Sequence, residues 1–150
     1  MQLSTFSDYS MRVMMFLGLQ HGQLATISDI AKAYAISENH LMKVVHHLAQ
    51  HGYVETVRGK GGGLRLVRAP ITVNIGEMLR ASENNTGLLP CLNSENECCI
   101  QISCKLMGIL SEAQTALFKV LDKYTLADLL KQEDSLALIL IHPKAVSTSK

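Results

Sequence analysis

The sequence contains no hydrophobic run long enough to cross a membrane. Its longest uninterrupted apolar stretch, residues 136–141, is far shorter than the roughly 20 residues that a membrane-spanning helix needs. The first residues also lack the basic segment and the following apolar run of a secretory signal. We therefore expect no membrane partner and a cytoplasmic location, where a reducing environment keeps cysteine thiols free to bind metal.

The sequence also has little net charge. The 150 residues carry a formal charge of +1, so composition gives no global sign of a nucleic-acid partner. The charge is nevertheless segregated along the chain: residues 53–68 hold four basic residues and one acidic residue, whereas residues 82–97 hold three glutamates and no basic residue. Since 47% of the residues are apolar, wholesale disorder is excluded, and the length fits one globular domain with an extension.

Recognisable catalytic sets are missing too. We find no Ser-His-Asp set, no phosphate-binding loop before a helix and no paired acidic residues at a spacing typical of an active site. The expectation is that the protein is not an enzyme.

Cysteine is absent everywhere except in one stretch of fourteen positions, which contains Cys91, Cys98, Cys99 and Cys104. Cys91, Cys98 and Cys104 are separated by six and five residues, and Cys99 is additional. Three spaced cysteines and one extra suit a soft metal centre better than a disulfide framework. A zinc-binding structural module and an electron carrier without DNA specificity remain alternatives at this point.

The first 52 residues predict three helices. Apolar periodicity and small polar caps place the helices at about 5–21, 27–34 and 38–51, the third with a buried stripe of Leu41, Val44, Val45 and Leu48. A short helix, a tight turn and a longer helix are typical of a helix-turn-helix. His47 and His51 are spaced to share a metal, but without a carboxylate partner we expect them on the surface or near phosphates.

DNA binding is predicted from the third helix and from the segment after it. The exposed start of the helix offers residue types that reach base edges and phosphates: Ser37, Glu38, Asn39, His40 and Lys43. Residues 53–58 and 64–68 alternate as two strands around the turn at 59–63, which makes the domain a winged helix. In this wing we expect DNA contacts from Arg58, Lys60, Gly61, Gly62 and Arg65, because glycines let the backbone approach phosphates and cations displace counterions.

The second half of the chain predicts a dimer. After a short helix at 75–81, residues 82–103 lose periodicity, and apolar residues then recur at spacings of three and four from Leu106 to Val120. We expect such a helix, which lies outside the winged-helix core, to pack on a second copy of the chain and form a two-fold dimer. Thr125 and Asp128 form a capping box that begins a last short helix, and the tail should fray.

These elements define the expected architecture. We predict a mostly α protein with a small β-hairpin wing, consisting of a winged helix-turn-helix and a long C-terminal dimerisation helix. The predicted regions are a DNA-binding domain at 1–81, a cysteine-bearing cluster loop at 82–103, the dimerisation and terminal helices at 104–131 and a flexible tail at 132–150.

Several motifs together resemble one family. Residues 37–41 open the third helix with Ser-Glu-Asn-His-Leu, residues 57–63 form a Val-Arg-Gly-Lys-Gly-Gly-Gly wing, and residues 124–129 read Tyr-Thr-Leu-Ala-Asp-Leu. With Asp8 and the three spaced cysteines, they resemble the NsrR-type nitric-oxide-sensing repressors, bacterial winged-helix regulators that also include IscR. The resemblance extends to about residue 131.

The resemblance implies an iron–sulfur cluster of the 4Fe-4S type. Its ligands would be Cys91, Cys98 and Cys104, with Cys99 as a possible substitute for Cys98, and Asp8 of the partner subunit. From the sequence alone Asp8 can instead pair with Arg12 one turn later. The IscR-type 2Fe-2S alternative expects a histidine three positions after the last cysteine, where this chain has Met107.

The implied function is that of a homodimeric repressor. It would bind a palindromic double-stranded DNA operator while the cluster is intact and release the operator when nitric oxide destroys or nitrosylates the cluster. A regulator of the same fold that senses iron, oxygen or redox state would carry the same cysteines.

Overall fold

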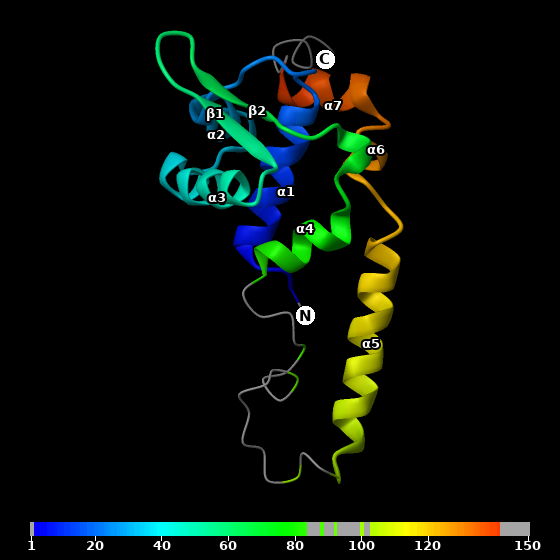
Figure 1. The fold of residues 1–150 in the computed structure, drawn as a ribbon. Coiled ribbons are helices and arrows are strands. Elements are labelled where there is room, and N and C mark those ends of the chain that lie inside the picture. Colours follow the sequence, from blue (N-terminus) through cyan, green and yellow to red (C-terminus); the bar gives the residue numbers. More distant parts are fainter. Residues whose placement is uncertain (1, 84–87, 89–91, 93–99, 101–102, 142–150) are drawn as a thin grey trace, which may run out of the picture.

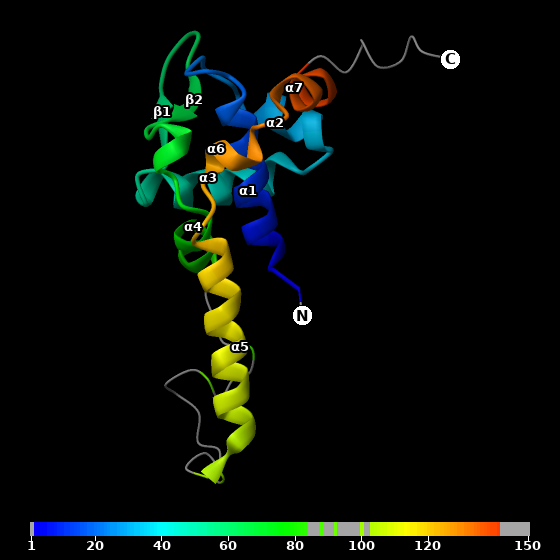
Figure 2. The ribbon, with the colours of Figure 1, turned by 90° about the vertical axis from the view of Figure 1, so that its right-hand side faces the viewer.

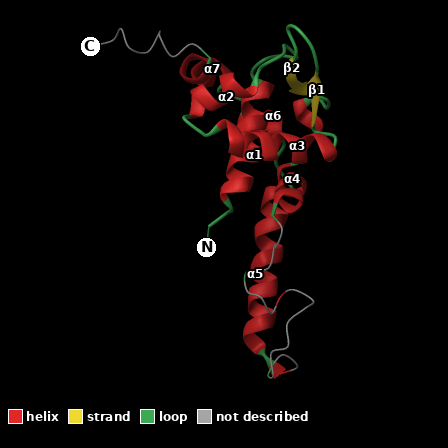
Figure 3. Cartoon of the chain, turned by 90° about the vertical axis from the view of Figure 1, so that its left-hand side faces the viewer, coloured by secondary structure: helices red, strands yellow, loops and turns green. Residues whose placement is uncertain are grey.

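The protein is described by a computed structural model, which places residues 2–83, 88, 92, 100 and 103–141. The described chain is mostly helical with one β-hairpin (Figures 1 and 3), as the sequence predicted. In order, its elements are α1 Thr5–Gly18, α2 Ile27–Tyr34, α3 Glu38–Gln50, β1 Val54–Val57, β2 Gly63–Leu66, the 3-10 turn η1 Pro70–Thr72, α4 Ile75–Ser82, α5 Lys105–Leu121, α6 Leu126–Leu129 and α7 Glu133–Leu140.

Small polar residues begin the helices of the first domain. The Ser4 hydroxyl accepts a hydrogen bond from the backbone N–H of Ser7 and caps α1, and Thr26 forms a capping box with Asp29 at the start of α2. Hydrogen bonds from Thr26 hold the pKa of the Asp29 carboxyl below its usual value. Helices α1 and α2 therefore begin where a side chain satisfies an otherwise unpaired N–H group of the first turn.

A single hydrophobic core joins α1, α3, the hairpin, α4 and α6. The predicted stripe of α3 is buried in full, and its neighbours in the core include Val13, Met14 and Leu17 of α1, Val54 and Leu64 of the strands, Met78 of α4 and Leu126 of α6. The core thus reaches from the first helix to the short helix at residue 126. Helix α3 of the helix-turn-helix therefore shares its core with α1, which precedes it, and with α6, which follows it by more than 70 residues.

The hairpin is an antiparallel pair in which Val54 lies opposite Leu66 and Val57 opposite Gly63. An isolated bridge between Ala25 and Leu64 attaches the hairpin to the segment before α2. The turn requires glycine at residue 62, because a Cβ there would lie 2.2 Å from the carbonyl oxygen of Val57. Glycine at this position therefore allows the tight turn that joins the two strands, while the bridge at Ala25 holds the hairpin against the domain.

Helix α5 leaves the domain as a long rod (Figures 1 and 2). None of its residues is buried in the single chain. Its C-terminal end is joined to α4 by two hydrogen bonds from the Arg80 guanidinium to the Asp122 carboxylate, at 2.8 and 2.6 Å, and Arg80 also lies over the ring of Phe118. The predicted Thr125–Asp128 capping box then begins α6, and hydrogen bonds from Lys131 and Thr125 lower the pKa of Asp128 to about 2.

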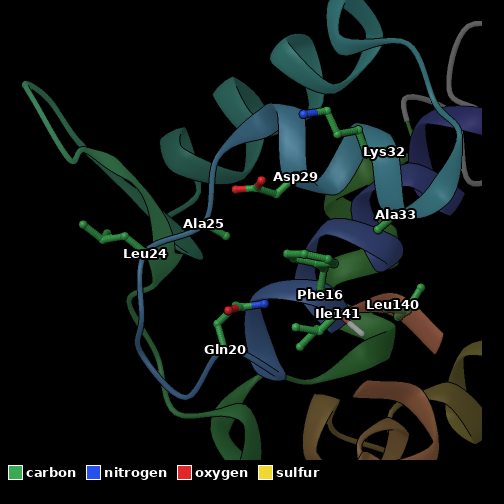
Figure 4. A pocket seen from close by; sticks show the side chains of 9 residues that line it. All are labelled: Phe16, Gln20, Leu24, Ala25, Asp29, Lys32, Ala33, Leu140 and Ile141. Carbon is green, nitrogen blue, oxygen red and sulfur yellow. The ribbon is translucent and has the colours of Figure 1, made fainter. Parts of the chain in front are cut away.

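The tail differs from the expectation of a flexible segment from residue 132. Residues Glu133–Leu140 form α7, with two carboxylates in its first turn, where the helix dipole favours negative charge. Leu140 and Ile141 pack against the core and line a cavity of about 320 Å³ together with Phe16 of α1 and Ala33 of α2 (Figure 4). The helix forms because these side chains find an apolar surface that only the fold creates. Residues 142–150 lie outside the described part of the chain.

Within the described residues, none of the helices is both long and apolar enough to cross a membrane.

Candidate nucleic-acid interface and metal ligands

The start of α3 presents its polar side chains to solvent. Glu38, Asn39, His40 and Lys43 are all exposed, and Ser37, which precedes the helix, makes no side-chain capping bond. Leu41 and Leu48 on the opposite face are fully buried and fix the orientation of the helix. All five polar positions that the sequence singled out are therefore accessible to a ligand.

The wing adds two accessible cations and a third that is paired. Arg58 and Lys60 are exposed, and neither forms an ion pair with any described residue. Arg65 lies directly opposite Glu55 in the strand register and forms an ion pair with it. The charge of Arg65 is thus partly balanced within the hairpin, which sets it apart from the two cations nearer the tip.

The wing and α3 lie on the same side of the domain (Figure 1). The exposed polar residues of α3 and the basic turn of the hairpin can therefore face one elongated partner together. In the winged-helix arrangement, a helix enters the major groove while a β-ribbon follows the backbone beside it.

His47 is not on the surface as expected. Its ring packs edge-on against Phe6 of α1 with a centroid distance of 5.1 Å, and the His51 ring lies 4.1 Å away. Burial first, and the neighbouring His51 second, lower the pKa of His47. His47 therefore belongs to the contact between α1 and α3. Among the described residues no three His, Cys, Asp or Glu side chains are grouped to hold a metal.

Asp8 lies in the first turn of α1 with 48% of its side chain exposed. Its carboxylate accepts a hydrogen bond from Nε of Arg12 at 2.9 Å, the pairing that the spacing of four residues suggests. The Arg12 guanidinium also lies 5.4 Å from the ring centroid of Tyr34 in α2. Asp8 is accessible, and within the described chain it already has a cationic partner.

Cys104 is the one cysteine within the described residues. It is the N-cap residue of α5, is partly exposed, and makes no side-chain capping bond. Cysteine binds metal through its sulfur as thiolate. Cys91, Cys98 and Cys99 lie outside the described residues.

The structure does not bring the two described ligand candidates together in one chain. Asp8 lies in the first turn of α1, whereas Cys104 precedes α5, whose first turn is at the end of the molecule remote from α1 (Figures 1 and 2). Their chemistry, a thiol and an accessible carboxylate, fits an iron–sulfur centre. Within one chain, Asp8 and Cys104 therefore do not form one site.

Sequence reasoning missed one contact at the beginning of the cysteine-bearing region. Glu83, at the end of α4, accepts a hydrogen bond of 2.8 Å from the backbone N–H of Ser4. Burial raises its pKa, but hydrogen bonds from Ser7 and Ser4 outweigh that effect and lower the pKa below its usual value. A contact between residues 79 positions apart leaves no signal in the sequence.

Comparison with known proteins gives a consistent result. The profile of the Rrf2 family, described as iron-dependent transcriptional regulators, matches residues 3–132. The HTH-type transcriptional regulator NsrR of Bacillus subtilis is 46% identical over 142 residues, covering 93% of this chain and 97% of the relative. NsrR of Geobacillus kaustophilus is 44% identical with the same coverage of both chains.

Solved structures of the same fold agree. The IscR structure from T. potens aligns with a TM-score of 0.70 at 26% identity and covers 88% of each chain. CymR, the global cysteine regulator of B. subtilis, aligns with a TM-score of 0.66 at 28% identity over 86% of this chain and 95% of the other.

Proposed function

The chain belongs to the Rrf2 family of transcriptional regulators, and on that premise we propose that it is a homodimeric DNA-binding repressor controlled by an iron–sulfur cluster that responds to nitric oxide. It is a regulator and not an enzyme. The observation that carries the proposal is the combination of an exposed polar helix face and an exposed basic wing on one side of the domain.

DNA recognition is assigned to α3 and the wing. Asn39, His40 and Lys43 would approach base edges and phosphates in the major groove, with Ser37 and Glu38 at the helix start. Arg58 and Lys60 of the wing would neutralise phosphates, and the glycines at 61 and 62 let the backbone come close. Arg65 would join them only by giving up its partner Glu55.

A two-fold dimer is supported by the state of α5. Leu106 and Ile109 are 55% and 62% exposed, and α5 buries none of its seventeen residues in the single chain. In proteins, most of the stability of a helix comes from the packing of its apolar face. A second copy packed along α5 would cover the apolar stripe and would present two α3 helices to a palindromic operator.

The cluster would be held between the two chains. Cys91, Cys98 and Cys104 of one chain would supply thiolates, with Cys99 as the alternative to Cys98, and the carboxylate of Asp8 from the other chain would complete the set. A bound 4Fe-4S cluster would supply iron that reacts with nitric oxide. Three cysteines leave a four-iron cluster one ligand short, which Asp8 would supply, and Met107 stands where a 2Fe-2S centre of the IscR type expects histidine.

The response to the signal would pass through Asp8. While Asp8 binds the other chain, it ties α1 of one subunit to the start of α5 of its partner. When Asp8 is released, Arg12 on the next turn offers its guanidinium. Since α1 also supports α3 through Phe6 and His47, a movement of α1 would reach the reading helix. A typical allosteric coupling of about 1–3 kcal/mol would change operator affinity roughly 5- to 150-fold.

The cluster is tested by anaerobic absorption and Mössbauer spectra, recorded before and after stoichiometric nitric oxide. The purified chain should be coloured and show a 4Fe-4S spectrum that nitric oxide destroys, and Cys104→Ala should abolish the visible absorption and weaken operator binding. A colourless chain with one zinc contradicts the cluster. A cluster that cycles between redox states but ignores nitric oxide identifies a sensor of another signal.

The wing is tested by the salt dependence of binding. Lys60→Ala should lower the slope of log affinity against log salt by about one for each half-site, because one phosphate contact is lost. Lys123→Ala, an exposed lysine after α5, is the matched control and should leave the slope unchanged. If Lys60→Ala leaves the slope unaltered, the wing does not contact the DNA. If the protein is reduced reversibly and has no sequence-specific affinity for DNA, it is an electron carrier.

A further inference from the structure

The exposed face of α3 carries one side chain that cannot form strong hydrogen bonds. Asn39, Met42, Lys43 and His46 are all exposed, and their spacings of three and four residues place them on one face, which we call the reading face. Met42 is 51% exposed and is the one large hydrophobic residue of α3 that is exposed. It also takes no part in the hydrophobic core.

An exposed hydrophobic residue is common on protein surfaces and has no meaning by itself. The position of Met42 gives it meaning, because it lies between Asn39 and His46 on the face that would enter the major groove. A thioether pressed against a base edge would separate donors and acceptors from water without replacing their hydrogen bonds, which costs free energy. Only one group on the major-groove edges is apolar, the 5-methyl group of thymine.

We infer that Met42 is a specificity-determining residue that contacts the 5-methyl group of a thymine in each operator half-site. This inference rests on the proposed DNA-binding function and names the base that the reading face selects. Methionine suits the contact because its flexible, polarisable side chain adapts to the surface that it meets.

The neighbouring residue extends the assignment to a second base pair. Asn39 precedes Met42 by three residues, about 4.5 Å along the helix axis, so the two side chains are neighbours on the reading face. An asparagine amide pairs with the N6 and N7 atoms of adenine. Asn39 and Met42 would therefore read adjacent base pairs, and Met42 would require thymine at one of them.

The experiment removes single methyl groups from the DNA. An operator is first selected from random duplexes with the full-length chain, and each thymine of one half-site is then replaced by deoxyuridine, which lacks only the 5-methyl group. At one thymine the wild-type chain should lose roughly fourfold in affinity, the value of one buried methyl group. Met42→Ala should bind the thymine operator about as weakly and should show no further loss with deoxyuridine.

The double-mutant comparison separates contact from indirect effects. Met42→Leu, which keeps an apolar side chain, should retain the penalty for deoxyuridine. Ile71→Ala alters a hydrophobic residue that is 67% exposed and lies outside α3, and it should also retain the full penalty.

Two outcomes overturn the inference and are distinguishable. Suppose that an operator is selected, but that at every thymine the ratio of the affinities for the thymine and deoxyuridine duplexes is the same for the wild-type chain and for Met42→Ala. The proposed contact of Met42 with thymine is then wrong, and DNA binding stands. If no sequence is selected by a chain that is folded by circular dichroism, the proposed function fails and the inference fails with it.

Discussion

Helices α3 and α5 have similar sequences in one respect and opposite environments in the structure. Each carries apolar residues at spacings of three and four. In α3 these residues are 0 to 5% exposed, whereas in α5 Leu106, Ile109 and Val120 are 50 to 62% exposed. The pattern alone therefore says that a helix has an apolar face, and it does not say whether the same chain covers that face.

The difference separates two kinds of stability in one protein. The face of α3 is covered by α1 and the hairpin of its own chain, so its packing does not depend on concentration. In the described chain α5 is held at its C-terminal end, through Arg80, Asp122 and Phe118. If a second copy covers α5, that part of the stability must depend on protein concentration.

The largest expected effect comes from a charge in the apolar stripe of α5. Ile109→Asp should convert the dimer to monomers, because two-fold symmetry removes two buried side chains at once, about 3–6 kcal/mol in total. Sedimentation velocity over a dilution series measures the change. Ile71→Asp, at a similarly exposed position outside α5, should leave the dimer intact. Equal association of wild type and Ile109→Asp would mean that α5 is not the interface.

A smaller effect is expected from a cavity beneath α3. Leu48 is 0% exposed, and Leu48→Ala should lower the free energy of unfolding of the domain by about 2–5 kcal/mol. Urea denaturation at two protein concentrations gives the result. The loss should be the same at both concentrations, in contrast to that of Ile109→Asp. A concentration-dependent loss would show that α3 and α5 do not differ in the way proposed.

The smallest effect concerns the end of α4, where the Glu83 carboxylate accepts a hydrogen bond from the backbone N–H of Ser4 before α1. Because the folded pKa of Glu83 lies below its ordinary value of 4.5, the carboxylate stabilises the fold above about pH 4.5, and this contribution is lost as pH falls through the folded pKa. Glu83→Gln should cost about 0.3–1 kcal/mol near neutral pH, as for a carboxylate at a helix N-terminus.

The control for this third prediction is Glu112→Gln, an exposed glutamate of α5. Thermal unfolding from pH 3 to 7 should show a difference between wild type and Glu83→Gln that shrinks as the pH falls, whereas Glu112→Gln should follow the wild type throughout. A difference that stays constant with pH would mean that the charge of Glu83 does not act on α1.

Local chemistry made much of the fold predictable. Thr26 and Asn74 cap their helices, Thr125 and Asp128 form the expected box, and the stripe of α3 is buried. Each of these features depends on residues within one or two helical turns. The first helix ends earlier than expected, at Gly18. The side chain of Leu130, a residue far away in the sequence, packs so close to Gly18 that a Cβ there would collide with it.

The candidate site was predicted less completely, because its parts are far apart. The exposure of Asn39, Lys43 and Lys60 followed from helix and hairpin periodicity. The burial of His47 against Phe6, the helix α7 and the bond between Ser4 and Glu83 did not, since each needs segments that approach only after folding. The cluster ligands at 91, 98 and 99 lie outside the described residues and stay a prediction.

The sequence by itself determined the elements and their chemistry: helices with small polar caps, a glycine turn between basic strands, and cysteines confined to one stretch. These properties are local, since propensity, capping and periodicity act over a few residues. Only the tertiary structure decided which apolar faces one chain can cover, that Arg65 pairs with Glu55, and that the start of α5 with Cys104 lies far from the first turn of α1 with Asp8. Burial and contact depend on distance in space, which a periodic pattern does not encode.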